Sequence, residues 1–291
     1  MEWIDFATPK TVSEAVELLA SHGDRGRAMA GGTDVLVQMR AGRRSAGLLV
    51  DLKGIPELNE LSYDSQKGLV VGAAVPCYRI YGEQAVISAY PGLIDAVSLV
   101  GGIQIQGRAS MGGNLCNAAP SGDTIPPTIV LGGVCNIAGP NGNRQVPAEE
   151  FCTGPGQNVL GSGEILVSIN LPPPQAHSGA NYQRFTPRNE MDIAVAGVGT
   201  AVVLDAGGQN FVSARIALSA VAPTPVLARE AGDSLAGKPV SDAAIQEASE
   251  KAMAAATPIN DMRGTIRQRT HLIGVLTRRT LNNAIQRARG G

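Results

Sequence analysis

Residues 30–34 read Ala-Gly-Gly-Thr-Asp and lie between a short strand candidate, residues 27–30, and a helix candidate, residues 33–41. Glycines let the backbone approach a phosphate closely, and N–H groups at the start of a helix bind anions. This segment lacks the spacing of a Gly-x-Gly-x-x-Gly or a Walker motif. It therefore indicates either a phosphate-binding turn in which Thr33 caps the helix, or an ordinary tight strand-to-helix turn.

The residues around this turn predict a small parallel sheet. Residues 3–6 and 47–52 are strand candidates, and Thr-Val-Ser-Glu at 11–14 reads as a capping box for a helix that stops at Gly23. The first 52 residues thus follow the order β-α-β-α-β, which favours parallel strands joined by crossover helices.

A second glycine-rich segment, Ser-Met-Gly-Gly-Asn at 110–114, precedes Asp123. Consecutive glycines beside Ser and Asn suit a loop whose backbone N–H groups form a nest for a pyrophosphate. Asp123 then offers an acceptor for sugar or ribityl hydroxyls. The alternative is a solvent-facing loop stabilised by Asx and Ser turns. Two such loops in separate halves of the chain favour a dinucleotide held between two lobes.

The rest of the chain reads as a mostly antiparallel α+β unit and a further domain. Pro172 to Pro174 is the clearest linker signal. We therefore predict an α+β fold with a β-α-β lobe at 1–55, an antiparallel α+β lobe at 56–174, and a C-terminal domain of a three-stranded antiparallel sheet and helices at 175–291. The elements expected after the linker are strands at 181–186, 193–204 and 211–221 and helices at 241–256, capped by Ser241, and 265–289.

Composition and sequence pattern argue against a nucleic-acid-binding, membrane-spanning or metal-binding protein. The net charge is −1 and aromatic residues make up 3%, which disfavours stacking platforms for nucleic acid. No apolar run reaches the ~20 residues of a membrane span. The cysteines form no Cys-x-x-Cys pair and lie far in sequence from the three histidines, so we expect reduced thiols, a cytoplasmic location and no metal site in this chain.

On these two segments the chain resembles the medium, FAD-binding subunit of the molybdenum hydroxylases, the family of xanthine dehydrogenase and aerobic carbon monoxide dehydrogenase. In that family both glycine segments hold the FAD diphosphate. The resemblance implies that the FAD-binding residues here are Ala30, Gly31, Gly32, Thr33, Asp34, Ser110, Gly112, Gly113 and Asn114. It also implies that Asp123 contacts the ribityl or diphosphate portion, Leu166 packs near a ring system, and Arg184 lies near the flavin where many relatives have lysine.

The family's function follows as an expectation. FAD on this chain receives electrons from the [2Fe-2S] clusters of a small partner subunit and passes them to an external acceptor, while a large partner subunit carries the molybdenum cofactor. The resemblance implies a dimer of heterotrimers. This chain needs no catalytic acid, base or nucleophile of its own.

Two alternatives stay open. The first is a free-standing FAD-dependent oxidase or dehydrogenase of the related two-lobed fold. The second is a structural subunit whose flavin site has decayed. The tail from residue 261 to 291 carries seven arginines and one acidic residue. It is either a solvated helix face or a docking surface for an acidic partner, with a nucleic-acid surface ranked well below both.

Overall fold

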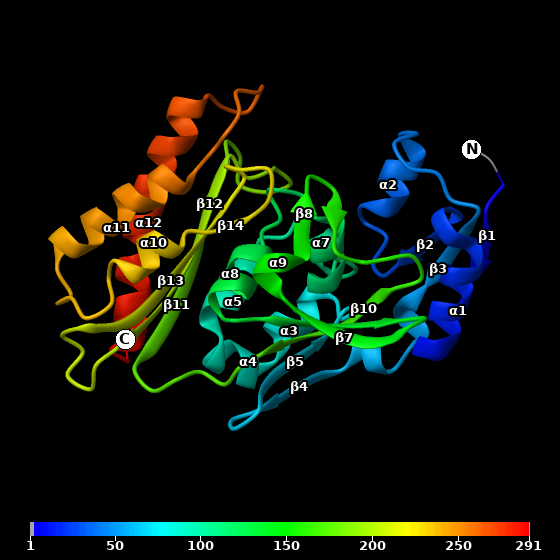
Figure 1. Cartoon of the computed structure of the whole chain (residues 1–291), viewed down its shortest axis with the longest axis horizontal. Coiled ribbons are helices and arrows are strands. Elements are labelled where there is room, and N and C mark those ends of the chain that lie inside the picture. The colour runs from blue at the N-terminus through cyan, green and yellow to red at the C-terminus, as the bar shows by residue number, and fades with distance from the viewer. Residues whose placement is uncertain (1–2, 291) are drawn as a thin grey trace.

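The computed structural model describes residues 3–290, and three main β-sheets follow one another along the chain. Figure 1 shows the N-terminal sheet at one end, the central sheet in the middle, and the C-terminal sheet with its helices at the other end. This order matches the predicted succession of a small lobe, a larger α+β lobe and a C-terminal domain.

The N-terminal sheet is parallel, as the sequence predicts. Its strands run in the order β1-β3-β2, and two helices form the crossovers. Thr11 begins the first helix by accepting the Glu14 N–H at 3.2 Å, and the Glu14 carboxylate accepts the N–H of Lys10 rather than that of Thr11. The bounds are β1 (Asp5–Ala7), α1 (Val12–His22), β2 (Gly26–Met29), α2 (Val35–Arg40) and β3 (Leu48–Asp51), with 3₁₀ turns at Gly23–Arg25, Leu52–Gly54 and Glu57–Asn59.

The central sheet is antiparallel and has the strand order β4-β5-β10-β6-β7. Its apolar side chains and those of the surrounding short helices form the largest buried cluster. The strands are β4 (Leu61–Asp64), β5 (Gly68–Gly72), β6 (Val134–Gly139), β7 (Gly142–Pro147) and β10 (Ile165–Leu171), with a separate hairpin of β8 (Cys152–Gly154) and β9 (Gln157–Asn158). The helices are α3 (Cys77–Gly82), α4 (Gln84–Ala89), α5 (Pro91–Val97), α6 (Ile103–Gln106), α7 (Met111–Asn117), α8 (Ile125–Val130) and α9 (Ala148–Phe151).

The prediction of a loop at residues 110–114 is wrong, because Ser110 begins α7 and the two glycines lie in its first turn. The Ser110 hydroxyl accepts the N–H of Gly113 at 3.0 Å, and the Ser110 carbonyl accepts the N–H of Asn114 at 2.9 Å. Glycine inside a helix normally costs about 0.5–1 kcal/mol relative to alanine. Here a Cβ on Gly112 would lie 2.5 Å from the Ala73 carbonyl oxygen, so the close packing of α7 requires glycine.

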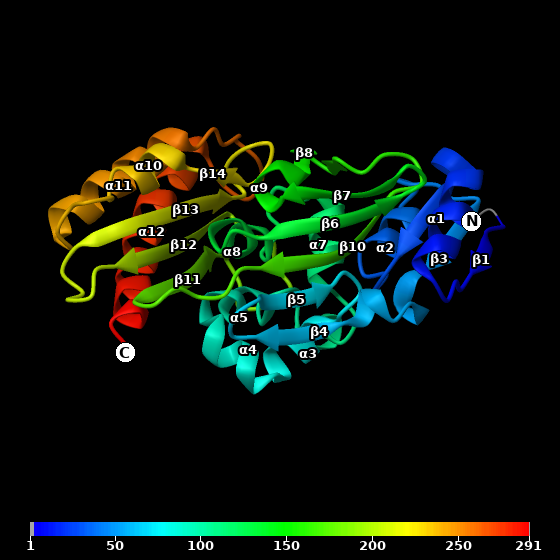
Figure 2. The same cartoon turned by 60° about the horizontal axis from the view of Figure 1, so that its bottom comes forward.

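The C-terminal sheet contains the three predicted strands and one short additional strand, β14, in the order β11-β12-β13-β14. Its helices cover one face, whereas α5 and α8 of the central unit pack on the other (Figure 2). The bounds are β11 (Ser178–Phe185), β12 (Ala196–Leu204), β13 (Phe211–Ser219), β14 (Val226–Leu227), α10 (Arg229–Asp233), α11 (Asp242–Ala255) and α12 (Ile266–Ala288). Among residues 3–290, every helix is too short or too polar to span a bilayer.

Most of the arginines in the basic tail are structural. Arg269 is buried and donates to the carbonyls of Val195 and Ala220 and to Asp261. Arg287 binds both carboxylate oxygens of Asp95 on α5, at 2.6 and 2.9 Å. The side chains of Arg278 and Arg289 also bond within the domain. These four arginines therefore form bonds within the protein, and whether the tail also docks a partner stays a prediction.

We expect Arg269→Met to lower the free energy of unfolding by about 3–5 kcal/mol, because it leaves two buried carbonyls and Asp261 without their charged partner. Arg279→Met on the same helix is the control, since Arg279 is exposed and should cost less than about 0.5 kcal/mol. Urea denaturation of both variants measures this difference. Equal stability of the two variants would contradict the structural role of Arg269.

Candidate functional site

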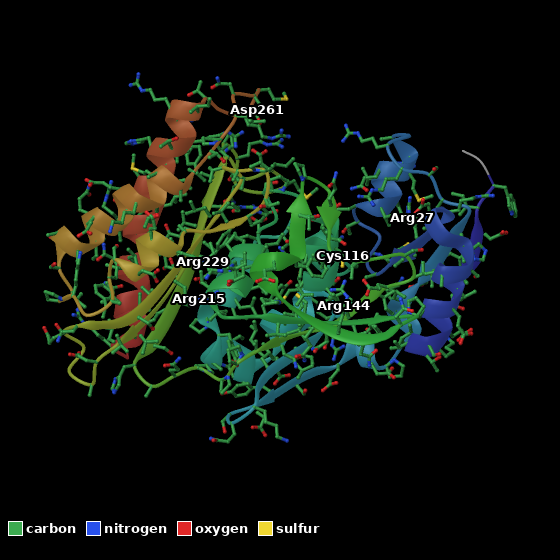
Figure 3. The ribbon with its side chains drawn as sticks, in the orientation of Figure 1. Arg27, Cys116, Arg144, Arg215, Arg229 and Asp261 are labelled. Atoms are coloured by element: carbon green, nitrogen blue, oxygen red, sulfur yellow. The ribbon has the colours of Figure 1, made fainter. Side chains whose placement is uncertain are left out.

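A cavity of about 500 Å³ lies between the N-terminal lobe and the central unit. Figure 3 labels one lining residue from each side, Arg27 on β2 and Cys116 on α7. Arg184 is absent from the cavity lining. The predicted residues that do line it are Ala30, Gly31, Gly32, Thr33, Asp34, Ser110, Gly112, Gly113, Asn114, Asp123 and Leu166. The fold therefore brings both glycine segments to one cavity.

The first segment carries a run of free backbone donors. Among residues 3–290, no acceptor forms a hydrogen bond with the N–H groups at positions 31 to 35. Gly32 has φ +78°, a left-handed conformation that glycine adopts without strain, and it turns the chain between β2 and α2. The predicted cap is wrong: the N-cap of α2 is Asp34, and its side chain makes no capping bond. The Thr33 side chain lines the cavity instead.

The two glycines of this segment serve different purposes. A Cβ on Gly31 would lie 2.0 Å from the carbonyl oxygen of Arg108, so Gly31 allows the N-terminal lobe to touch the central unit. A Cβ on Gly32 would meet only the flexible side chains of Leu36 and Met29, at 3.0 Å or more. Gly31 thus brings the two lobes together, and Gly32 sets the direction of the following N–H groups.

The second segment forms another part of the cavity wall. In the described chain the N–H of Gly112 has no acceptor, whereas that of Gly113 is bound by Ser110. A Cβ on Gly113 would meet only the Ser110 hydroxyl, at 3.0 Å, and would otherwise project into open space. Because Gly113 lines the cavity, its missing side chain leaves room there for a ligand.

Asn114 and Asp123 line the cavity and are held by hydrogen bonds to neighbouring side chains. The side-chain oxygen Oδ1 of Asn114 accepts from the hydroxyl of Thr124 at 2.8 Å, which fixes the loop that precedes α8. Asp123 is buried and accepts from the Tyr182 hydroxyl at 2.8 Å and from Arg184 Nη1 at 2.5 Å. Burial raises the pKa of Asp123 to about 6, against the opposing charge of Arg184. Arg184 therefore contacts the cavity only through Asp123.

Several lining residues have no signal in the sequence. Residues 191–194 come from a loop of the C-terminal domain, and nothing in the sequence predicts their place at the cavity. The predicted start of a strand at residue 193 is wrong, because β12 begins at Ala196. Gln38 on α2 donates to the Asn117 side chain of α7 at 2.8 Å and so links the lobes. Gln38 lies four residues after the glycine segment, and this proximity is the only feature of the sequence that connects it with the site. The other residues missed include Arg27, Arg44, Ile105, Cys116 and Leu160.

The chemistry of the lining suits the binding of a phosphorylated cofactor. Burial raises the pKa of the Cys116 thiol to about 12, so the thiol stays protonated and is a poor nucleophile at neutral pH. Partial burial also raises the pKa of Asp34. Free N–H groups, Arg27 and Arg44 suit phosphate oxygens, while Ile105 and Leu166 offer apolar surface. The residues present thus fit a dinucleotide such as FAD.

Comparison with known families assigns the two parts of the chain separately. Residues 2–174 match the FAD binding domain in molybdopterin dehydrogenase. Residues 181–284 match the CO dehydrogenase flavoprotein C-terminal domain. The junction between the two matches falls on the segment that leads from the proline linker into β11.

Relatives match over almost the full length. The chain is 32% identical over 290 residues to the xanthine dehydrogenase FAD-binding subunit of Escherichia coli O157:H7, which covers 98% of each chain. It is 33% identical over 281 residues to the carbon monoxide dehydrogenase medium chain of Hydrogenophaga pseudoflava, which covers 96% of each. The structure also matches a chain of CO dehydrogenase from Oligotropha carboxidovorans with a TM-score of 0.93 and 30% identity, over 98% of this chain and 99% of that chain. The chain therefore belongs to the family of FAD-binding medium subunits of the molybdenum hydroxylases, to which the xanthine and carbon monoxide dehydrogenases belong.

Proposed function

We propose that this chain is the FAD-carrying electron-transfer subunit of a molybdenum hydroxylase complex. The observation that carries the proposal is that the N–H groups at positions 31 to 35 make no hydrogen bond among residues 3–290, while these residues line a cavity together with residues of the other lobe. When bound, FAD supplies a ring that accepts electrons and releases them singly or in pairs. The chain itself binds, orients and shields that ring.

Different residues would bind different parts of FAD. The N–H groups of residues 31–35 and of Gly112 would hold the diphosphate, because successive backbone N–H groups form strong anion sites. Asp123 would accept from a ribityl hydroxyl, and Arg184 would hold it in place. Leu166 would pack against a ring. The full set that we propose for FAD is Ala30, Gly31, Gly32, Thr33, Asp34, Ser110, Gly112, Gly113, Asn114, Asp123, Leu166 and, indirectly, Arg184.

The proposed partners are a small subunit with [2Fe-2S] clusters and a large subunit with the molybdenum cofactor, as a dimer of heterotrimers. The relatives in carbon monoxide dehydrogenase are named medium chains, which supports an assembly of several subunits. A cytoplasmic location stays a prediction from the cysteine pattern.

The two alternatives are less well supported. The free-standing oxidase is disfavoured because relatives that match this chain over almost its full length are named as an FAD-binding subunit and as a medium chain. Gly113 disfavours a decayed site. A side chain at this position would meet only the Ser110 hydroxyl, so the fold itself does not require glycine there, whereas a bound ligand does.

Purification of the native complex tests the proposed role. We expect this chain to co-purify with a large and a small subunit, with a flavin absorption spectrum and with bound molybdenum. A yellow chain that purifies alone with substrate-reducible flavin would favour the free-standing oxidase. A colourless chain inside the same complex would favour the structural subunit.

Gly113→Val should raise the FAD dissociation constant by about a hundredfold or more, because a side chain there enters the space left for the ligand. The stability of the FAD-free variant should change by less than about 1 kcal/mol, since valine and glycine have similar helix propensities. Calorimetric titration with FAD and thermal melting measure the two effects. Gly82→Val is the control, because open space surrounds Gly82 at the end of α3. Unchanged FAD affinity in Gly113→Val would contradict the proposed diphosphate site.

Arg184→Met should destabilise the protein strongly at pH 8 and only slightly at pH 5. The ordinary pKa of Asp123 is 3.8 and its folded-state pKa is about 6, so the carboxyl is largely neutral at pH 5 and ionised at pH 8. Loss of Arg184 then leaves a buried carboxylate unpaired only at the higher pH, which costs about 3–5 kcal/mol.

Urea denaturation at the two pH values measures this dependence. Arg144→Met is the control, because its partner Glu164 has a lowered pKa and stays ionised at both pH values. That exposed pair should cost less than about 1 kcal/mol at either pH. A cost for Arg184→Met that is independent of pH would show that Asp123 keeps one protonation state over this range.

A further inference from the structure

We infer that Lys53 and Arg108 are positioning residues for the proposed diphosphate site, and that they act by holding two backbone carbonyls away from the cavity. This inference rests on the proposed function. Neither side chain lines the cavity, and no sequence motif marks either residue. Both act on the peptide groups of the segment at residues 30–34.

The contacts are specific to two adjacent carbonyls. Lys53 Nζ donates to the Ala30 carbonyl at 3.1 Å and to the Asp51 carboxylate at 2.5 Å. Arg108 Nε donates to the Gly31 carbonyl at 2.9 Å. Lys53 follows β3 of the same lobe, whereas Arg108 precedes α7 of the central unit. Two cationic groups from opposite sides therefore bind consecutive peptides of one turn.

Because the peptide bond is planar, a contact that fixes a carbonyl also fixes the direction of the N–H group of the next residue. In a trans peptide the carbonyl of one residue and the N–H of the next point in opposite directions. The Ala30 carbonyl is held towards Lys53, so the N–H of Gly31 points the other way. The Gly31 carbonyl is held towards Arg108, so the N–H of Gly32 also points away from that side chain. Both glycines line the cavity, and their N–H groups have no acceptor among residues 3–290.

Side chains of the turn itself cannot supply this control. Gly31 and Gly32 have none, and Gly32 has the left-handed φ of +78° at which peptide orientation is easily changed. The backbone bonds of the turn begin with Leu36, whose N–H binds the Gly32 carbonyl at 3.3 Å. The orientation of the first two peptides therefore depends on Lys53 and Arg108. Their positive charges lie beside the turn and also favour a bound anion.

The test uses the full-length chain, FAD as the ligand, and the variants Lys53→Met and Arg108→Met. We expect each to raise the FAD dissociation constant by about tenfold, which is the scale of one hydrogen bond to a charged group. Lys53→Arg keeps the charge and the donor and should restore most of the affinity. The phosphorus NMR signals of bound FAD should move towards those of free FAD in the two methionine variants, and melting of the FAD-free chain reports stability.

Arg289→Met is the matched control, because Arg289 also donates to a glycine carbonyl, that of Gly208, in the C-terminal domain. It should change neither the affinity nor the phosphorus signals. Wild-type affinity and signals in both methionine variants would overturn the inference while leaving the proposed function intact. A loss of affinity that follows only a fall in melting temperature, with no rescue by Lys53→Arg, would assign a purely structural role and also overturn it. Failure of the wild-type chain to bind FAD would overturn both proposals.

Discussion

A backbone N–H group that leaves bulk water needs an acceptor. The lining of the cavity includes a run of residues whose N–H groups bind no acceptor among residues 3–290. Residues 31–35 form this run, and Gly112 adds one more donor from the opposite lobe. The arrangement is stable only with water or a ligand anion at the donors. Glycines stand here because a Cβ at Gly31 or Gly112 would collide with a carbonyl of the neighbouring segment, and because Gly32 adopts a left-handed φ.

The architecture places these donors in a defined way. The first glycine segment follows the carboxyl end of β2, the edge at which parallel α/β sheets commonly bind ligands. The antiparallel central unit brings α7 to the same cavity, because Gly112 lets that helix approach Ala73. The C-terminal sheet then supports the cavity from behind through Tyr182 and Arg184, which bind Asp123. Family membership and geometry therefore both support the proposed FAD site between two lobes.

Much of this was predictable, and the failures have physical causes. The parallel β-α-β-α-β lobe, the antiparallel second lobe and the helix capped by Ser241 follow from periodicity and capping residues, which act locally. Residues 110–114 were predicted as a loop because glycine disfavours helices, whereas packing against Ala73 outweighs that preference. Lys53 and Arg108 escaped prediction because a side chain bound to a distant backbone carbonyl leaves no pattern in sequence. The same holds for residues 191–194, which reach the cavity from another domain.

The central claim is that the backbone of residues 31–35 holds the FAD diphosphate. A crystal structure of the full-length chain with FAD is its most direct test. We expect phosphate oxygens within about 3 Å of several of these backbone nitrogens, the ordinary distance of an N–H···O bond. A diphosphate bound elsewhere, with these N–H groups facing only water, would contradict it.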